Sequence, residues 1–278
     1  MEGKLYQINN QLSYFLNGKS NKLILLIGGL GDLLFSVKYF EYLWEKLNDY
    51  KLCIPIMRSS GNSFGNTIIW DDVEDIKEII KHISYNNEIK DIYLIGHSTG
   101  CQDILCLFKK KIQKEFPIRK CILQGPVSDR DFVINDINLK NEIKRIENKS
   151  NILFKDWNNS ELKNSIEVSQ YLYDNKYPLL IRRFISLYSK LGDEDWFSYD
   201  IEQNILNQLY SIIDIPFLFV FSLNDQYVNY SNEEYNELIK RIEKTNSNIK
   251  IYILNDNHFI DNSKEEFFQI VTNFFSSK

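Results

Sequence analysis

The sequence predicts an α/β protein in which a mostly parallel β-sheet carries helices on both faces. Three observations predict this class. Short, continuous apolar runs recur along the chain, as expected for strands that are buried on both faces of a parallel sheet. Segments with apolar residues at helical spacing separate these runs. A single long stretch, residues 129–213, interrupts the alternation and shows no convincing strand. Strands and helices that alternate in this way imply parallel strands joined by helical crossovers.

The elements follow in order. Residues 5–8 and 12–16 alternate apolar and polar side chains on either side of a polar turn, which predicts an opening hairpin. Carboxylates from Asp71 to Asp75 open a helix at the end where the helix dipole favours negative charge. The remaining expected elements are strands at 23–27, 52–57, 91–95, 120–124, 217–221 and 249–254, and helices at 37–47, 98–111, 232–242 and 265–275.

The interrupting stretch is expected to be a cap. Residues 137–146, 161–173 and 179–191 resemble amphipathic helices joined by polar turns. An insertion of this size between two core strands is best explained as a helical cap over the edge of the sheet. We therefore predict a core of residues 1–128 and 214–278 and a helical cap insertion of residues 129–213.

Composition and charge exclude several classes of function. The 278 residues are 44% hydrophobic and 26% charged, which is ordinary for a folded protein. A net charge of −5 argues against nucleic-acid binding. The longest apolar runs are too short for a membrane span, and the N-terminus lacks the apolar run of a secretory signal. Nothing in the sequence indicates an obligate protein partner.

Cysteine and histidine usage narrows the location and chemistry. The four cysteines form no C-x-x-C pair, which favours a reduced, cytoplasmic protein. The three histidines show no metal-ligand spacing, so no metal site is expected. No cofactor is expected either.

The most informative motif is Gly96-His97-Ser98-Thr99-Gly100, which follows an apolar strand and precedes a helix-compatible run. This is the G-x-S-x-G nucleophile elbow, in which the serine lies on a strained strand-to-helix turn. Gly96 and Gly100 are expected because the backbone must pass close to its neighbours there. The motif predicts Ser98 as a nucleophile, against the alternative of a tight turn that happens to contain serine.

A serine nucleophile needs a base and an acid that orients the base. With this motif the acid follows the serine in the chain and the histidine comes last. Of the three histidines only His258 fits, in the polar loop after the last strand. Asp225 follows the strand at 217–221 and is the expected acid. Asp129, which follows the preceding core strand, remains an alternative.

The oxyanion hole needs two backbone donors. One is expected to be the Thr99 N–H, directly after the nucleophile. The second is expected from the loop Gly28-Gly29-Leu30-Gly31-Asp32, with the Leu30 N–H as the first choice and Gly29 as the alternate. Ser98 would then attack an ester-like carbonyl with His258 as base and form an acyl-enzyme that water hydrolyses.

Four segments carry a more specific resemblance. They are Gly28-Gly29-Leu30-Gly31-Asp32, Gly96-His97-Ser98-Thr99-Gly100-Cys101-Gln102-Asp103, Gly125-Pro126-Val127-Ser128-Asp129-Arg130 and Gly192-Asp193-Glu194-Asp195-Trp196-Phe197-Ser198. In this order, over nearly the whole chain, they resemble the DUF1749 family of α/β-hydrolases, which is known mainly from fungi and plants and includes fungal siderophore esterases. The resemblance implies an α/β-hydrolase fold with a helical cap. It also implies an intracellular carboxylic ester hydrolase without a metal cofactor, with Ser98, Asp225 and His258 as its triad.

Three other segments contain conspicuous charged residues. Arg58, after the strand at 52–57, is expected to contact a carboxylate or hydroxamate of the substrate. Asp129 and Arg130 are expected to form a structural ion pair that anchors the base of the cap. Residues 193–195 are expected to form a solvated acidic loop beside an anchored aromatic residue.

The predicted function is therefore a serine carboxylesterase that acts on a small-molecule ester with a small or medium acyl group. A thioesterase or lipase-like acyl hydrolase is the alternative, because the same triad serves both. A catalytically silent scaffold that binds a small apolar ligand is the alternative of a different class.

Overall fold

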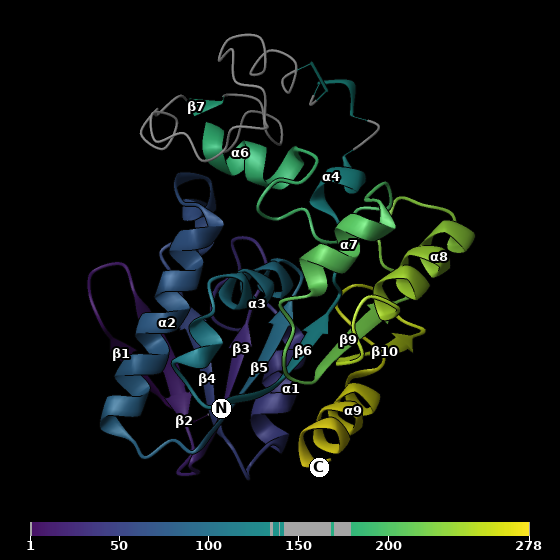
Figure 1. Ribbon diagram of the computed structural model, residues 1–278. Helices are drawn as coiled ribbons and strands as arrows, with labels where there is room; N and C mark the ends of the chain where they lie inside the picture. The colour runs from purple at the N-terminus through teal and green to yellow at the C-terminus, as the bar shows by residue number, and fades with distance from the viewer. Residues whose placement is uncertain (1, 134–135, 139, 142–167, 170–178, 278) are drawn as a thin grey trace.

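The computed structural model describes residues 2–133, 136–138, 140–141, 168–169 and 179–277 (Figure 1). Its main sheet has eight strands in the order β1-β2-β4-β3-β5-β6-β9-β10. These strands are β1 (Lys4–Gln7), β2 (Ser13–Asn17), β3 (Lys22–Ile27), β4 (Lys51–Ile56), β5 (Asp91–His97), β6 (Ile118–Gln124), β9 (Phe217–Ser222) and β10 (Ile249–Leu254).

The sheet is parallel from β4 to β10, and β1 and β2 are antiparallel at one edge. The predicted opening hairpin is therefore confirmed, with Tyr6 paired to Tyr14. All six strands predicted after the hairpin are present, with boundaries shifted by at most two residues, and β10 lies at the second edge of the sheet. Because the central strands are parallel, their carboxyl ends lie at the same edge of the sheet, where ligands of open α/β sheets bind.

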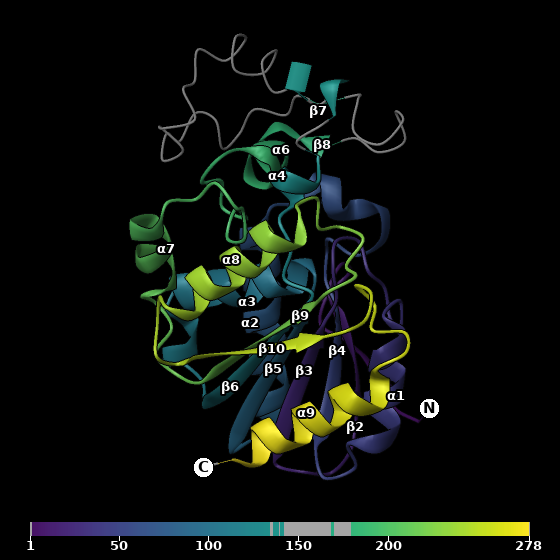
Figure 2. The same cartoon turned by 90° about the vertical axis from the view of Figure 1, so that its right-hand side faces the viewer.

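Helices cover both faces of the sheet, as Figures 1 and 2 show. Their bounds are α1 (Lys38–Lys46), α2 (Ile69–Asn86), α3 (Thr99–Lys109), α7 (Gln203–Tyr210), α8 (Asn232–Glu243) and α9 (Lys264–Ser276), with short 3₁₀ turns at Gly61–Asn66 and Ile112–Lys114. Alternate residues of β3 face opposite sides: Leu23 and Leu25 pack with α2 and α3, and Ile24 and Leu26 pack with α1 and α9. This period of two explains why the strand reads as a continuous apolar run. The predicted fold class is confirmed.

The interrupting stretch contains helices α4 (Asp129–Phe132) and α6 (Ile181–Tyr188). It also contains a two-stranded antiparallel ladder of β7 (Val168–Ser169) and β8 (Leu179–Leu180), so the expectation that it lacks strands is wrong. Two residues are too few to produce a recognisable alternation of side chains. The helix expected over 179–191 is shorter and spans α6, because 179–180 belong to β8. The helices expected over 137–146 and 161–173 lie mostly outside the described residues.

The division into a core and a cap of residues 129–213 stays a prediction. The packing of the side chains places the C-terminal boundary of the cap before residue 196 instead of after residue 213. Trp196, Phe197 and Leu206 join the same apolar cluster as α2 and α3. Tyr210 is fully buried there and donates a hydrogen bond from its hydroxyl to the Trp196 carbonyl, at 2.8 Å. By packing, residues 196–213 belong with the sheet and its helices.

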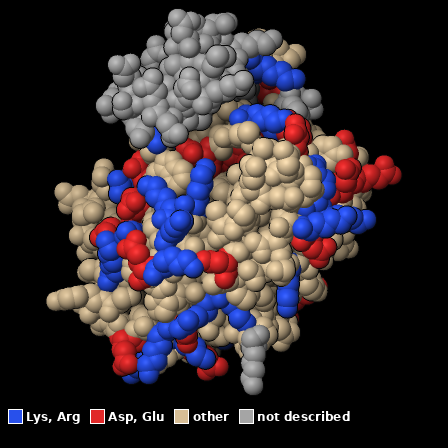
Figure 3. All heavy atoms as spheres, viewed as in Figure 1, with Lys and Arg blue, Asp and Glu red and all other residues tan. Residues whose placement is uncertain are grey.

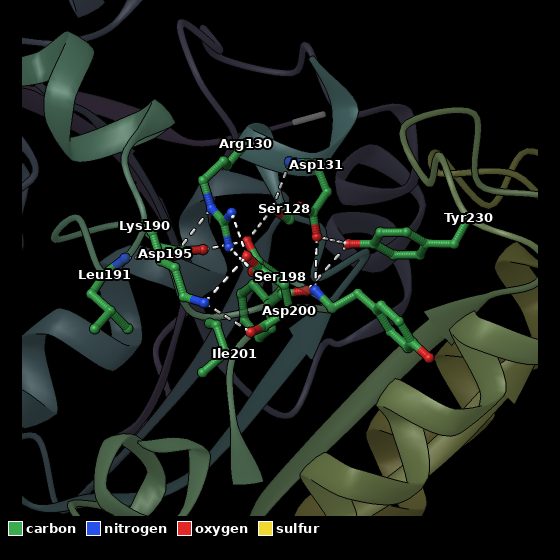
Figure 4. A network of polar contacts seen from close by, with 12 residues as sticks. Ser128, Arg130, Asp131, Lys190, Leu191, Asp195, Ser198, Asp200, Ile201 and Tyr230 are labelled. Carbon is green, nitrogen blue, oxygen red and sulfur yellow. Dashed lines mark hydrogen bonds and ion pairs between the residues drawn. The ribbon is translucent and has the colours of Figure 1, made fainter. Parts of the chain in front are cut away.

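A polar network joins the start of the insertion to the segment that returns to the core (Figure 4). Arg130 forms ion pairs with Asp195, at 3.2 Å, and with Asp200. Asp131 accepts hydrogen bonds from the Tyr199 N–H, at 2.7 Å, and from the Tyr230 hydroxyl. These contacts hold the first residues of the insertion against residues 195–200 and against Tyr230 of the core.

The network corrects two expectations about charged residues. Arg130 does anchor this region, but its partners are Asp195 and Asp200 instead of Asp129. Glu194 and Asp195 are buried, so the acidic loop is not solvated as expected. Each buried carboxyl group has a cationic partner that lowers the cost of burying it, Arg183 for Glu194 and Arg130 for Asp195. A sequence pattern does not show such partners, which lie far away along the chain.

Candidate active site

The elbow has the geometry that the motif predicts. β5 ends at His97 and α3 begins at Thr99, and Ser98 between them has φ +53° and ψ −122°. A positive φ is strained for a serine and turns its side chain away from the regular strand. A Cβ at Gly96 would lie 2.4 Å from the Gly100 carbonyl oxygen, and one at Gly100 would lie 2.4 Å from the Ile27 carbonyl oxygen. Both positions therefore require glycine.

The predicted base and acid meet. His258 Nδ1 lies 2.6 Å from Asp225 Oδ2, and both side chains are buried. Asp225 follows β9 and His258 follows β10, so neighbouring parallel strands bring them to one edge of the sheet. The His258 N–H also donates to Gln226 Oε1, at 3.2 Å. His258 is held in this loop by its ring and by its main chain.

Asp129, the alternative acid, lies elsewhere in the site. Its carboxylate accepts a hydrogen bond from Gln102 Nε2, at 3.1 Å. Burial raises the pKa of Asp129 to about 6, and the nearby Arg183 opposes this rise. Between the two carboxylates, Asp225 is the one that contacts the predicted base.

Ser98 and His258 open into the same cavity, whose volume is about 440 Å³. Apolar and aromatic side chains form much of its wall, together with two carboxylates. The lining residues are Gly29, Leu30, Asp32, Phe64, His97, Ser98, Thr99, Val127, Ser128, Asp129, Phe132, Tyr227, His258 and Phe259. A concave, largely apolar site with a few polar groups is typical of small-molecule binding.

The glycine-rich loop after β3 lies against the elbow. A Cβ at Gly29 would lie 2.9 Å from Ser98 Cβ. The Gly29 N–H donates to Asp32 Oδ2, at 2.7 Å, so the carboxylate shapes the loop from within. Burial raises the pKa of Asp32. Leu30 and Thr99, whose N–H groups are the predicted oxyanion donors, both line the cavity.

Arg58 lies in a structural ion pair instead of the cavity wall. The Arg58 guanidinium contacts Asp75 at 2.5 Å and Asp71 at 3.6 Å. The main-chain N–H of Arg58 also donates to Asp75 Oδ2, at 2.9 Å. Asp75 is fully buried on α2. The ion pairs hold the end of β4 against that helix and occupy the group that was expected to contact substrate. The substrate contact expected for Arg58 therefore has no support in this geometry.

Two residues of the site escaped prediction. His97 Nδ1 lies 2.6 Å from Gln124 Oε1, and Gln124 Nε2 donates to the His258 carbonyl, at 2.9 Å. Burial is the main reason why the pKa of His97 falls to about 3, followed by the nearby His258. Gln124 is a polar residue that ends the apolar run of β6 at the active edge, and this is the signal that the sequence offers.

Within the described part of the chain, no group of three or more His, Cys, Asp or Glu side chains has an arrangement that could hold a metal ion. All four cysteines are unpaired and buried. Among the same residues, no helix is both long enough and apolar enough to cross a membrane.

A comparison with models of protein families shows to which family the chain belongs. The model of the family described as "Protein of unknown function (DUF1749)" matches residues 3–266. The chain belongs to the DUF1749 family. This DUF1749 protein is 26% identical over 275 residues to UPF0613 protein PB24D3.06c of Schizosaccharomyces pombe, with 88% of this chain and 85% of the relative covered. It is 23% identical to Esterase AN6793 of Emericella nidulans, with 76% and 70% covered.

Solved structures show the same fold. The siderophore hydrolase EstB from Aspergillus fumigatus superimposes on the DUF1749 chain with a TM-score of 0.70 at 20% identity, covering 99% of this chain and 98% of that one. An α/β-hydrolase fold protein of unknown function superimposes with a TM-score of 0.74 at 18% identity, covering 99% and 96%. Est1E from Butyrivibrio proteoclasticus does so with a TM-score of 0.61 at 16% identity, covering 98% and 97%. The DUF1749 chain therefore has the α/β-hydrolase fold.

Proposed function

We propose that this protein is a serine hydrolase that cleaves a carboxylic ester with a small or medium acyl group. The observation that carries the proposal is that Ser98, in a strained elbow, lines one cavity with His258, whose Nδ1 is hydrogen-bonded to Asp225. Similarity to an esterase and to a siderophore hydrolase supports the proposal at the level of the family and the fold.

In the proposed mechanism, His258 Nε2 takes the hydroxyl proton of Ser98 as Oγ attacks the ester carbonyl carbon. Asp225 accepts the Nδ1–H of His258, which fixes the tautomer and stabilises the imidazolium that forms. His258 then gives the proton to the leaving alkoxide, and the acyl group stays on Ser98. Water attacks the acyl-enzyme in the same way, and the carboxylic acid leaves.

The oxyanion that develops on the carbonyl needs two donors. We assign these to the backbone N–H groups of Thr99 and Leu30. The Gly29 N–H, the alternate, already donates to Asp32, which favours Leu30. The N-terminus of α3 adds a favourable field, because its first turn carries unpaired N–H groups.

The test is covalent labelling of the full chain by a fluorophosphonate probe, followed by rates on nitrophenyl esters of rising acyl length. We expect wild type to be labelled and Ser98→Ala to be unlabelled, because only an activated serine reacts. Nitrophenyl thioesters of matched length separate an esterase from a thioesterase. Long-chain esters test the lipase-like alternative.

The control for folding is the thermal unfolding midpoint, which should be similar for Ser98→Ala and wild type. Well-folded wild type that resists the probe and leaves every ester intact would overturn the proposal. That result would favour a silent scaffold that binds a small apolar ligand.

We also propose a cytoplasmic location, which four buried, unpaired cysteines support.

A further inference from the structure

Gln124 is hydrogen-bonded to the main chain of both the proposed nucleophile and the proposed base. Its main-chain carbonyl accepts a hydrogen bond from the Ser98 N–H, at 3.0 Å. Its side-chain Nε2 donates to the His258 carbonyl, at 2.9 Å. Gln124 ends β6 and is the register partner of His97, the last residue of β5. One fully buried residue therefore bonds to the nucleophile turn and to the loop of the base.

The orientation of the Gln124 amide follows from its partners. The His258 carbonyl only accepts, so the amide must present its NH₂ group there and its oxygen to His97. The distance from Oε1 to His97 Nδ1 is 2.6 Å, and a carbonyl oxygen also only accepts. His97 must therefore carry its proton on Nδ1. The result is a directed chain of hydrogen bonds from His97 through Gln124 to the main chain of His258.

The surroundings of His97 keep its ring neutral, and this fixes the direction of the hydrogen bonds. His97 is buried, and burial is the main reason why its pKa falls to about 3. Its ring lies 4.7 Å from the His258 ring, centroid to centroid. A charged His97 would oppose the positive charge that the base acquires when it takes a proton. A neutral His97 donates to Gln124 and leaves the base free to become charged.

Next to this chain, the backbone leaves His258 little room. Gly125 has φ +61°, and a Cβ there would lie 2.9 Å from His258 Cε1. The ring is thus bounded by Gly125, by Asp225 at Nδ1, and by Tyr227, whose ring centroid is 4.7 Å away. Small shifts of the loop would bring the ring against these neighbours, so the main-chain anchor at Gln124 controls where Nε2 lies.

We infer that His97 and Gln124 are positioning residues that hold the base at a set distance from the nucleophile. This inference rests on the proposed serine hydrolysis and assigns a role to the variable residue of the G-x-S-x-G motif. Neither residue is asked to touch the reacting atoms. Their effect passes through the main chain of His258 and through the Ser98 N–H.

Three single variants of the full chain and one double variant test this inference with a short nitrophenyl ester. Gln124→Met removes both side-chain hydrogen bonds and keeps the main-chain bond to Ser98. His97→Leu removes the donor to Gln124. His97→Asn is the matched control, because its amide nitrogen occupies roughly the place of Nδ1 and still donates.

We expect Gln124→Met and His97→Leu to lower kcat by about 10²-fold, as a displacement of about 1 Å does. KM should stay nearly unchanged in Gln124→Met, because Gln124 is not among the residues that line the cavity. His97→Asn should recover most of that loss. The double variant His97→Leu/Gln124→Met should be about as slow as the slower single variant, because both changes break the same chain. Rates are divided by the concentration of protein. A thermal unfolding midpoint above the assay temperature shows that each variant is folded.

Wild-type kcat in a folded Gln124→Met variant would overturn the inference while leaving the proposed function intact. Losses that multiply in the double variant would overturn it too, since they would mean independent roles. If Gln124→Met does not fold, the comparison of His97→Leu with His97→Asn decides: equal kcat values overturn the inference. Wild type that is neither labelled nor active instead overturns the proposed function on which the inference rests.

Discussion

Single residues at the carboxyl ends of four strands determine the proposed chemistry. Ser98 follows β5, Gln124 ends β6, Asp225 follows β9 and His258 follows β10. The sequence alone singles out Ser98 and His258 as candidates, because a motif marks one and elimination among three histidines marks the other. The choice of acid stayed open because two aspartates follow core strands. Gln124 belongs to no motif, and only the pairing of β5 with β6 reveals its partners.

The two aspartates differ in their contact with His258, and this difference is measurable. Asp225→Asn should lower kcat by on the order of 10³–10⁴-fold, because an amide no longer favours the tautomer that the base needs. Asp129→Asn is the matched control and should retain kcat within several-fold, because Asp129 contacts Gln102 instead. Steady-state rates on one nitrophenyl ester suffice. A loss in Asp129→Asn equal to that in Asp225→Asn would reassign the acid.

At the scale of elements, periodicity predicted most of the molecule. Central strands such as β3 and β5 are buried on both faces and bounded by turns, so a continuous apolar run identifies them. The amphipathic helices follow from apolar residues at a spacing of three and four. β7 and β8 were missed because each has only two residues. The burial of Glu194 and Asp195 was missed because their cationic partners are distant in sequence.

The ion pairs at the base of the insertion should matter for stability. Arg130→Met leaves the buried Asp195 carboxylate without its main cationic partner, which should cost about 3–5 kcal/mol in the free energy of unfolding. Arg119→Met removes an exposed pair with Asp91 and is the matched control, with an expected cost of about 0–1 kcal/mol. Urea denaturation measures both. Equal costs would show that the Arg130 network contributes no more than a surface pair.

At the scale of the whole molecule, charge is distributed in two ways. On the face seen in Figure 3, basic and acidic side chains are intermixed. Inside, Arg183 of α6 is fully buried and pairs with Asp72 of α2, at 3.2 Å, and with Glu194, at 2.8 Å. Asp103 of α3 is buried nearby and its pKa is raised by burial. The insertion is thus joined to the core through an arginine and buried carboxyl groups whose pKa values are raised by burial.

This interior makes stability depend on pH in a defined direction. Burial raises the pKa of Glu194 from 4.5 to about 8. Below about pH 8 the folded state keeps this proton, while the unfolded chain has lost it above about pH 4.5. The free energy of unfolding should therefore fall as pH rises towards 8, by at most about 1.4 kcal/mol per pH unit.

Glu194→Gln isolates this contribution, because glutamine does not titrate and its oxygen can still accept from Arg183. Between about pH 6.5 and 8 the free energy of unfolding of the variant should depend less on pH than that of wild type, because the variant lacks the Glu194 carboxyl group. Glu202→Gln, at an exposed position, is the control and should behave as wild type does. Urea denaturation at several pH values measures the slopes. Parallel curves for Glu194→Gln and wild type would contradict this account.

The double attachment of Gln124 has a consequence for how such proteins diversify. The spacing of nucleophile and base is set by hydrogen bonds among strand ends of the core. None of those bonds involves α6 or the β7–β8 ladder. Those elements pack against Leu30 and Phe64 of the cavity wall, so changes there can alter the wall while these hydrogen bonds stay in place. The shape of the cavity can therefore change in evolution separately from the spacing of Ser98 and His258.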